Sequence, residues 1–166
     1  KPLSDFGIQE PTWLLWNSTL VFLAIGIFLN AYTALRFYFK KRRYRYPLKV
    51  LLIVSSFSLF FTATIPMDYE LFHRIPAFLF FFTYNLFVFS FGLFRSFQQI
   101  RAGVLSVFIG LAMTFSLLLL LPFKSYGVFE IVYFALILLW NIHFLFTRMK
   151  EEGMKSNKEG FLKFFQ

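Results

Sequence analysis

The chain has 166 residues, of which 58% are hydrophobic and only 15% are charged, and its formal net charge is +9. A soluble domain has about 25% charged residues, so this chain has too little polar surface to enclose a water-soluble core. It contains no cysteine, which excludes disulfides and thiolate metal sites.

Five apolar stretches fill most of the sequence, and each is long enough, or nearly long enough, to cross a bilayer. About 20 helical residues span the hydrocarbon core, which is about 30 Å thick. The stretches do not alternate with a period of two, which favours helices over a barrel. We predict an all-α polytopic transmembrane helical bundle over residues 1–149 and a cytoplasmic tail over 150–166. The predicted helices are 13–35, 48–65, 76–94, 104–121 and 129–147.

Prolines mark the ends of the first three predicted helices. Pro11 precedes the first helix, Pro47 opens the second and Pro76 opens the third, because proline is tolerated best in the first turn of a helix. A residue before proline avoids helical backbone, so Ile65 ends the second helix. Short connections predict that sequential helices pack as antiparallel neighbours.

Basic residues gather on one side of the predicted five-helix topology. The first connection, the third connection and the tail hold 14 of the 17 Lys and Arg residues. The positive-inside rule therefore predicts that these segments and the C-terminus are cytoplasmic. The N-terminus of this chain then faces outward, and we expect a multi-pass protein of a prokaryotic cytoplasmic membrane.

The densest basic cluster has two interpretations. It is either a topology anchor or a site for anionic lipid or for a soluble partner, because cations next to a membrane attract anionic headgroups at about 1 kcal/mol each. Nucleic acid is not an expected partner, since these charges lie beside membrane spans. The cluster comprises Lys40, Lys41, Arg42, Arg43 and Arg45.

Acidic residues and one histidine gather at the opposite, outer side. Ionisable groups near a membrane are candidates for function. The alternative is structural: Glu130 lies about one turn inside its helix, where it suits the helix N-terminus, and His73 suits a hydrogen-bonding role. The outer candidate site comprises Asp5, Asp68, Glu70, His73 and Glu130.

The sequence predicts no metal site, no cofactor and no catalytic residue. A metal site needs three or four ligands in fixed geometry, whereas His73 and His143 fall on opposite sides of the membrane in this topology. No hydrolase, phosphate-loop or dinucleotide motif is present.

Four asparagines lie inside the predicted helices. We interpret them as interhelical hydrogen-bonding residues, with bonds of about 0.6 kcal/mol each, in preference to a polar transport path, which requires several intramembrane charges in series. They are Asn17, Asn30, Asn85 and Asn141.

Short motifs resemble the DRAM/Sfk-type membrane family and its bacterial and archaeal relatives. The segment Pro2-Leu3-Ser4-Asp5-Phe6-Gly7, followed by Glu10-Pro11 and Trp16-Asn17, is similar to the Ser-Asp-x-Gly loop before the second of six helices in that family. His73 before the aromatic run at 77–81 and Glu130 before the last helix are also similar, although Arg74 and Pro76 depart from the family pattern.

The resemblance implies a sixth helix upstream of Lys1. It also implies roles in membrane lipid organisation, autophagy modulation or lipid-anchor remodelling, with no catalytic residues to transfer. We therefore expect a non-enzymatic integral membrane protein that engages lipids or organises membrane partners. Two alternatives remain open: an accessory subunit of a larger membrane complex, and a lipid-modifying enzyme that uses the outer acidic and histidine residues.

Overall fold

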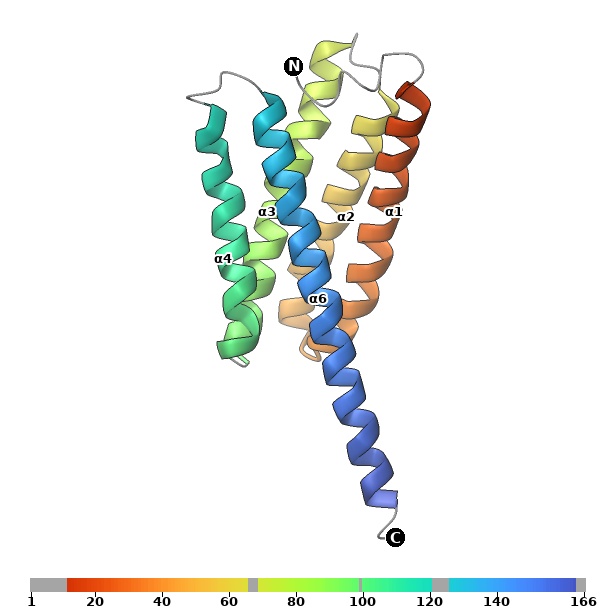
Figure 1. Cartoon of the computed structure of the whole chain (residues 1–166), viewed down its shortest axis with the longest axis vertical. Helices are drawn as coiled ribbons and strands as arrows, with labels where there is room; N and C mark the ends of the chain where they lie inside the picture. The colour runs from red at the N-terminus through yellow and green to blue at the C-terminus, as the bar shows by residue number, and fades with distance from the viewer. Residues whose placement is uncertain (1–11, 66–68, 99, 121–125, 164–166) are drawn as a thin grey trace.

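A computed structural model of the chain describes residues 12–65, 69–98, 100–120 and 126–163. These residues form long helices and, within the described ranges, no strand (Figure 1). The all-α prediction is therefore confirmed. The elements are α1 (Thr12–Tyr38), α2 (Arg42–Thr64), α3 (Glu70–Ser96), α4 (Ile100–Ser116), the short 3-10 helix η2 (Leu117–Leu119) and α6 (Tyr126–Lys163).

Four of the described helices are long and apolar enough to cross a membrane. Their spans are Thr12–Leu29, Arg42–Thr64, Leu71–Ser96 and Gly127–Glu151. At the predicted fourth span the structure has a shorter apolar helix, Gly103–Leu119, which rises about 25 Å. That length is a little less than the hydrocarbon thickness of about 30 Å.

The first four helices pack in sequential pairs, as their short connections predict. α1 contacts α2, α2 contacts α3, and α3 contacts α4. α6 then returns across the bundle (Figure 1) and packs against α4. Its aromatic side chains also reach α3, where the Phe81 and Tyr133 ring centroids are 4.8 Å apart, and α1, where those of Tyr38 and Phe144 are 5.4 Å apart.

Two helices begin before the prolines that were predicted to open them. α2 begins at Arg42, so Pro47 lies inside it, and α3 begins at Glu70, so Pro76 lies inside it. The prediction that these prolines start the helices is wrong. A proline removes one backbone N–H and therefore one hydrogen bond of the helix. The other backbone hydrogen bonds of the first turns still form, so each helix begins one to two turns before its proline.

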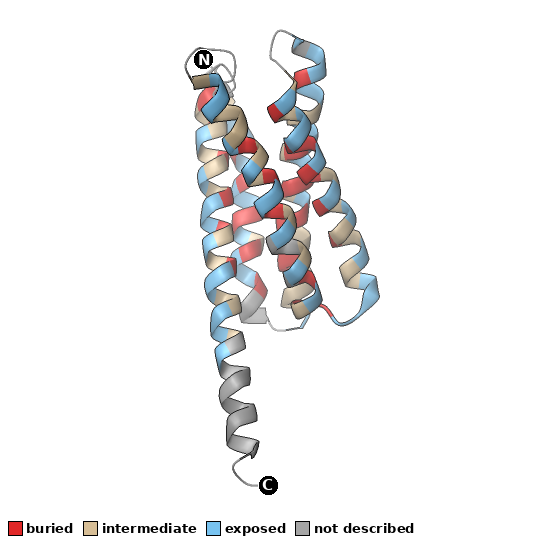
Figure 2. Ribbon diagram, turned by 90° about the vertical axis from the view of Figure 1, so that its right-hand side faces the viewer, coloured by how far each residue is buried: buried red, intermediate tan, exposed pale blue. Residues whose placement is uncertain are grey.

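Aromatic side chains fill the core between α3 and α6. The Trp140 indole packs edge-on against Phe87 and Phe91, with ring centroids 5.6 Å away in both cases, and stacks on Phe144 at 5.0 Å. All four residues are buried, and burial follows one face of each helix (Figure 2). Edge-to-face pairs add about 0.5–1.5 kcal/mol beyond area burial.

The outward surface of the bundle is strongly apolar. Phe22, Phe78 and Phe146 are 73%, 70% and 68% exposed. Exposed apolar surface on this scale marks contact with another apolar medium, which for membrane-length helices is the acyl-chain region.

Glycines set a close contact between α3 and α4. A Cβ on Gly103 would strike the carbonyl oxygen of Gly92 and the backbone of Ser96. A Cβ on Gly92 would lie 2.6 Å from the Val107 nitrogen, and one on Gly110 would lie 2.9 Å from the Phe89 Cα. The two backbones therefore touch, as small residues allow in membrane helix pairs.

α6 continues beyond the end of its membrane span. The span ends at Glu151, whereas the helix ends at Lys163. The extra residues lengthen the helix by about 18 Å, and this part projects past the other helices (Figure 1). The predicted tail is thus helical up to residue 163.

Candidate functional site

A groove lies between α2 and α3 on the surface of the bundle. It encloses about 460 Å³, within the range of about 300–1,000 Å³ that small-molecule sites occupy. It runs from the middle of α2 to the end at which α2 meets α3. Its walls are Ile53, Val54, Phe57, Ser58, Phe61 and Ile65 of α2 and Phe72, Ile75, Pro76 and Leu79 of α3.

The groove opens onto the outside of the bundle. Phe57 and Phe72 are 59% and 68% exposed although both line it, whereas Ser58, its polar wall residue, is buried. Water is absent at membrane depth, so backbone and side-chain polar groups there bond within the protein. A hollow with such walls suits hydrocarbon rather than a polar ligand.

His73 bonds to the backbone of Ile65, the last α2 residue in the groove wall. Its Nδ1 lies 2.8 Å from the carbonyl oxygen of Ile65, and the ring is buried, with 7% exposed. Because a carbonyl oxygen accepts, Nδ1 carries the proton and donates. The Ile65 N–H in turn donates to the Phe61 carbonyl oxygen at 2.9 Å. His73 therefore ties the first turn of α3 to the end of α2.

The other outer candidates are only partly described. Asp5 and Asp68 lie outside the described residues, as does the side chain of Glu70. Glu130 is half-buried near the start of α6, at the same end of the bundle as His73. Among the described side chains, no three His, Cys, Asp or Glu residues come together as a metal site.

The basic cluster lies at the opposite end of the bundle. Lys40, Lys41, Arg42 and Arg43 are exposed and Arg45 is half-buried. The Arg43 Nη2 donates to the Tyr44 hydroxyl at 2.7 Å. This end also carries Arg36 and Lys49, so cations surround the connection between α1 and α2.

Two of the predicted interhelical asparagines bond between helices. Asn85 Nδ2 of α3 donates to Thr114 Oγ1 of α4 at 2.9 Å. Asn141 Nδ2 of α6 lies 2.9 Å from the Tyr84 hydroxyl of α3 and 2.8 Å from the Ile137 carbonyl oxygen. Asn17 is half-buried in α1, and the Asn30 side chain is outside the described residues.

Sequence reasoning missed two further bonds of α6. Trp140 Nε1 donates to Ser106 Oγ of α4 at 3.0 Å, and the Tyr133 hydroxyl donates to the Phe81 carbonyl oxygen of α3 at 2.5 Å. The seven-residue spacing of Tyr133 and Trp140 is the signal that places them on one face. Their partners depend on which helices pack beside α6.

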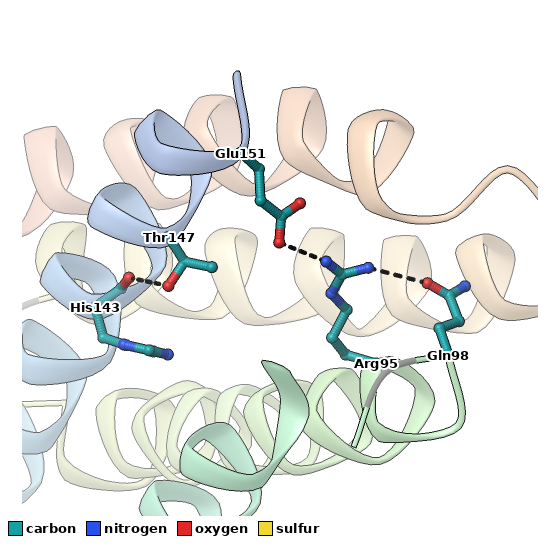
Figure 3. A network of polar contacts seen from close by, with 5 residues as sticks. All are labelled: Arg95, Gln98, His143, Thr147 and Glu151. Atoms are coloured by element: carbon teal, nitrogen blue, oxygen red, sulfur yellow. Dashed lines mark hydrogen bonds and ion pairs between the residues drawn. The ribbon is translucent and has the colours of Figure 1, made fainter. Parts of the chain in front are cut away.

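Sequence reasoning also missed an ion pair between α3 and α6. Arg95 Nη2 lies 2.5 Å from Glu151 Oε1, and Arg95 Nη1 donates to Gln98 Oε1 at 3.3 Å (Figure 3). The Arg95 guanidinium also lies 4.8 Å from the Tyr38 ring centroid. One arginine thus joins the ends of three helices at the basic end of the bundle.

A small void lies beside this ion pair. It encloses about 10 Å³, and Tyr38, Arg95, Ser106, His143 and Thr147 are among its walls. That volume is near the minimum for a single water molecule. The Thr147 hydroxyl donates back to the His143 carbonyl oxygen at 2.9 Å (Figure 3).

The whole bundle falls within one family match. A family model described as "Protein of unknown function (DUF998)" matches residues 1–147. No curated protein and no solved structure matches the chain. This match gives no support for the DRAM/Sfk-type name that the short motifs suggest. With nearly nine-tenths of its length matched, the chain belongs to the DUF998 family.

Proposed function

We propose that this protein is a non-enzymatic integral membrane protein that binds a membrane lipid by its acyl chain, in the groove between α2 and α3. The observation that carries the proposal is the groove itself, about 460 Å³ in volume and apolar apart from Ser58. An empty groove would leave its walls without contacts on one side. Lipid acyl chains surround the protein inside a bilayer, so an acyl chain is the group that can fill the groove.

The hydrogen bond of His73 supports a groove of fixed shape. It holds the end of α2 against the start of α3, so the two walls keep their spacing without a lipid between them. A preformed site loses less free energy to ordering when a ligand binds. This preorganisation favours retention of one lipid in the groove over non-specific contact with the many lipids that surround the protein.

Filling the groove is expected to expel the lipid. Val54→Trp places a large side chain between the walls, and an acyl chain that loses about ten heavy-atom contacts loses about 1–2 kcal/mol. Retention of lipid should fall about tenfold. Native mass spectrometry of the full chain after mild delipidation measures the number of lipids that remain.

Ile75→Trp is the second test, because Ile75 lines the groove but is 57% exposed, and so is not part of the packed core. Leu138→Trp is the matched control: Leu138 is 62% exposed on α6, outside the groove walls. Equal lipid retention in the wild type and both groove variants would contradict the proposal.

We also propose that the basic end of the bundle faces the cytoplasm, as the positive-inside rule predicts. The chain has no cysteine, so single cysteines report orientation cleanly. Tyr69→Cys, between α2 and α3, should react with a membrane-impermeant maleimide on intact cells, whereas Lys41→Cys should react only after lysis. The reverse pattern would overturn this orientation.

One observation favours the accessory-subunit alternative. The part of α6 beyond Glu151 continues as a helix away from the bundle, and a projecting helix suits contact with a partner. The lipid-modifying alternative uses the outer acidic and histidine residues. Asp5, Asp68 and the Glu70 side chain among them lie outside the described residues, and this alternative stays a prediction of the sequence alone.

A further inference from the structure

Two cations from different helices converge on one tyrosine of α1. The Arg36 guanidinium carbon lies 5.3 Å from the Tyr32 ring centroid, and its Nη2 donates to the Tyr32 hydroxyl at 3.3 Å. The Lys49 Nζ of α2 lies 4.3 Å from the same centroid. The negative face of the ring attracts each cation, but the ring carries no net charge to balance them.

No carboxylate of the described residues balances this pair. The ion pair found within the described ranges joins Arg95 to Glu151, and it involves neither Arg36 nor Lys49. Two like charges held near one ring repel each other. An anion between them would turn that repulsion into attraction.

Two further cations of α2 lie on the same helix face as Lys49. Arg45 and Arg42 precede Lys49 by four and seven residues, and residues with these spacings share one face of a helix. The face therefore carries three cations in a row, ending beside Tyr32 and Arg36.

The pair lies near enough to the basic end of the bundle for its charged ends to reach the phosphate layer of a bilayer. Arg36 is in the last turn of α1, and Lys49 lies seven residues into α2, or about 10 Å from its start. Headgroups occupy about 5–8 Å on each side of the hydrocarbon core. Long basic side chains at this depth extend their charged ends toward the headgroups.

We propose that Arg36, Lys49 and the Tyr32 hydroxyl form a binding site for the phosphodiester of an anionic phospholipid. The arginine donates two parallel N–H bonds to phosphate oxygens, the lysine supplies a point charge, and the tyrosine hydroxyl donates a third bond. This site lies between α1 and α2 at the basic end. It is separate from the groove and does not depend on it.

The experiment compares two double variants of the full chain with equal charge loss. Arg36→Gln with Lys49→Gln removes the site, whereas Lys40→Gln with Lys41→Gln removes two exposed neighbouring charges. Purified protein in neutral detergent is titrated with phosphatidylglycerol or phosphatidylcholine, and bound lipid is counted by native mass spectrometry. Thermal unfolding checks that each variant is folded.

We expect the site variant to bind phosphatidylglycerol about thirtyfold more weakly, since each interfacial cation contributes about a fivefold factor. The control pair should change affinity less than about threefold, and Tyr32→Phe should show a smaller loss than the site variant. Phosphatidylcholine should bind the wild type more weakly than phosphatidylglycerol, because its choline cancels the phosphate charge.

Two results would overturn the proposal. One is an equal loss in the site and control variants, which would mean diffuse attraction of the whole basic end. The other is complete displacement of phosphatidylglycerol by millimolar inorganic phosphate, which would mean a site for free phosphate. Resistance to inorganic phosphate supports a lipid-bound phosphate, because the acyl chains anchor it at the site.

Discussion

Gly103→Ala is expected to destabilise the bundle more than any other single-methyl change described here. The new Cβ would strike the Gly92 carbonyl oxygen and the Ser96 backbone, and backbone atoms cannot rotate away as a side chain can. Overpacking of this kind costs about 3 kcal/mol. Alanine regains about 1 kcal/mol in helix propensity, so the net loss is about 2 kcal/mol.

A net loss of this size should lower the thermal midpoint in detergent by about 4–8 °C. Gly26→Ala is the matched control, since nothing lies within 4 Å of a Cβ built on Gly26. The Gly26→Ala variant should be as stable as the wild type or slightly more stable, because the change raises helix propensity and introduces no clash. A midpoint for Gly103→Ala equal to that of Gly26→Ala would show that α3 and α4 do not touch at these glycines.

Arg95→Ala is expected to release the end of α6. The substitution removes the bonds to Glu151 and Gln98 and the contact with the Tyr38 ring, and it leaves the Glu151 carboxylate without its cation. Breaking a buried pair costs about 3–5 kcal/mol. The side chains of this pair are 12% and 22% exposed, so we expect about 2 kcal/mol after solvent screening.

Hydrogen exchange separates this local effect from a general loss of stability. Amides in residues 145–163 should exchange about thirtyfold faster in Arg95→Ala, while those of the α1–α2 pair stay close to the wild type. Arg43→Ala is the control, because Arg43 is exposed and its bond within the described part of the chain is to its neighbour Tyr44. Unchanged exchange in 145–163 would mean that the ion pair does not hold α6.

The double variant Arg95→Ala with Glu151→Gln tests whether the two residues of the ion pair act as a unit. Glu151→Gln alone should cost about 1 kcal/mol, because the amide oxygen still accepts a bond from Arg95. Adding it to Arg95→Ala should cost almost nothing further, since the partner is already gone. Additive losses would indicate that Arg95 acts mainly through Tyr38 and Gln98.

The groove could not be predicted from the sequence. Val54 and Ile75 are ordinary apolar residues within apolar stretches, and no sequence pattern distinguishes groove walls from any lipid-facing surface. His73 was recognisable as an unusual residue, but its partner is a backbone carbonyl, and backbone acceptors carry no sequence signature. The groove therefore emerged only from the spacing of α2 and α3.

The sequence by itself determined the helical class, the approximate spans and the antiparallel order of neighbours, because hydropathy, helix rise and short connections are local properties. The tertiary structure decided what α6 packs against, how closely Gly103 approaches Gly92, and that Pro47 and Pro76 lie inside helices. These features depend on contacts between residues far apart in the chain. In a bilayer such contacts arise from shape and hydrogen bonding rather than from hydrophobicity, so apolar periodicity could not specify them.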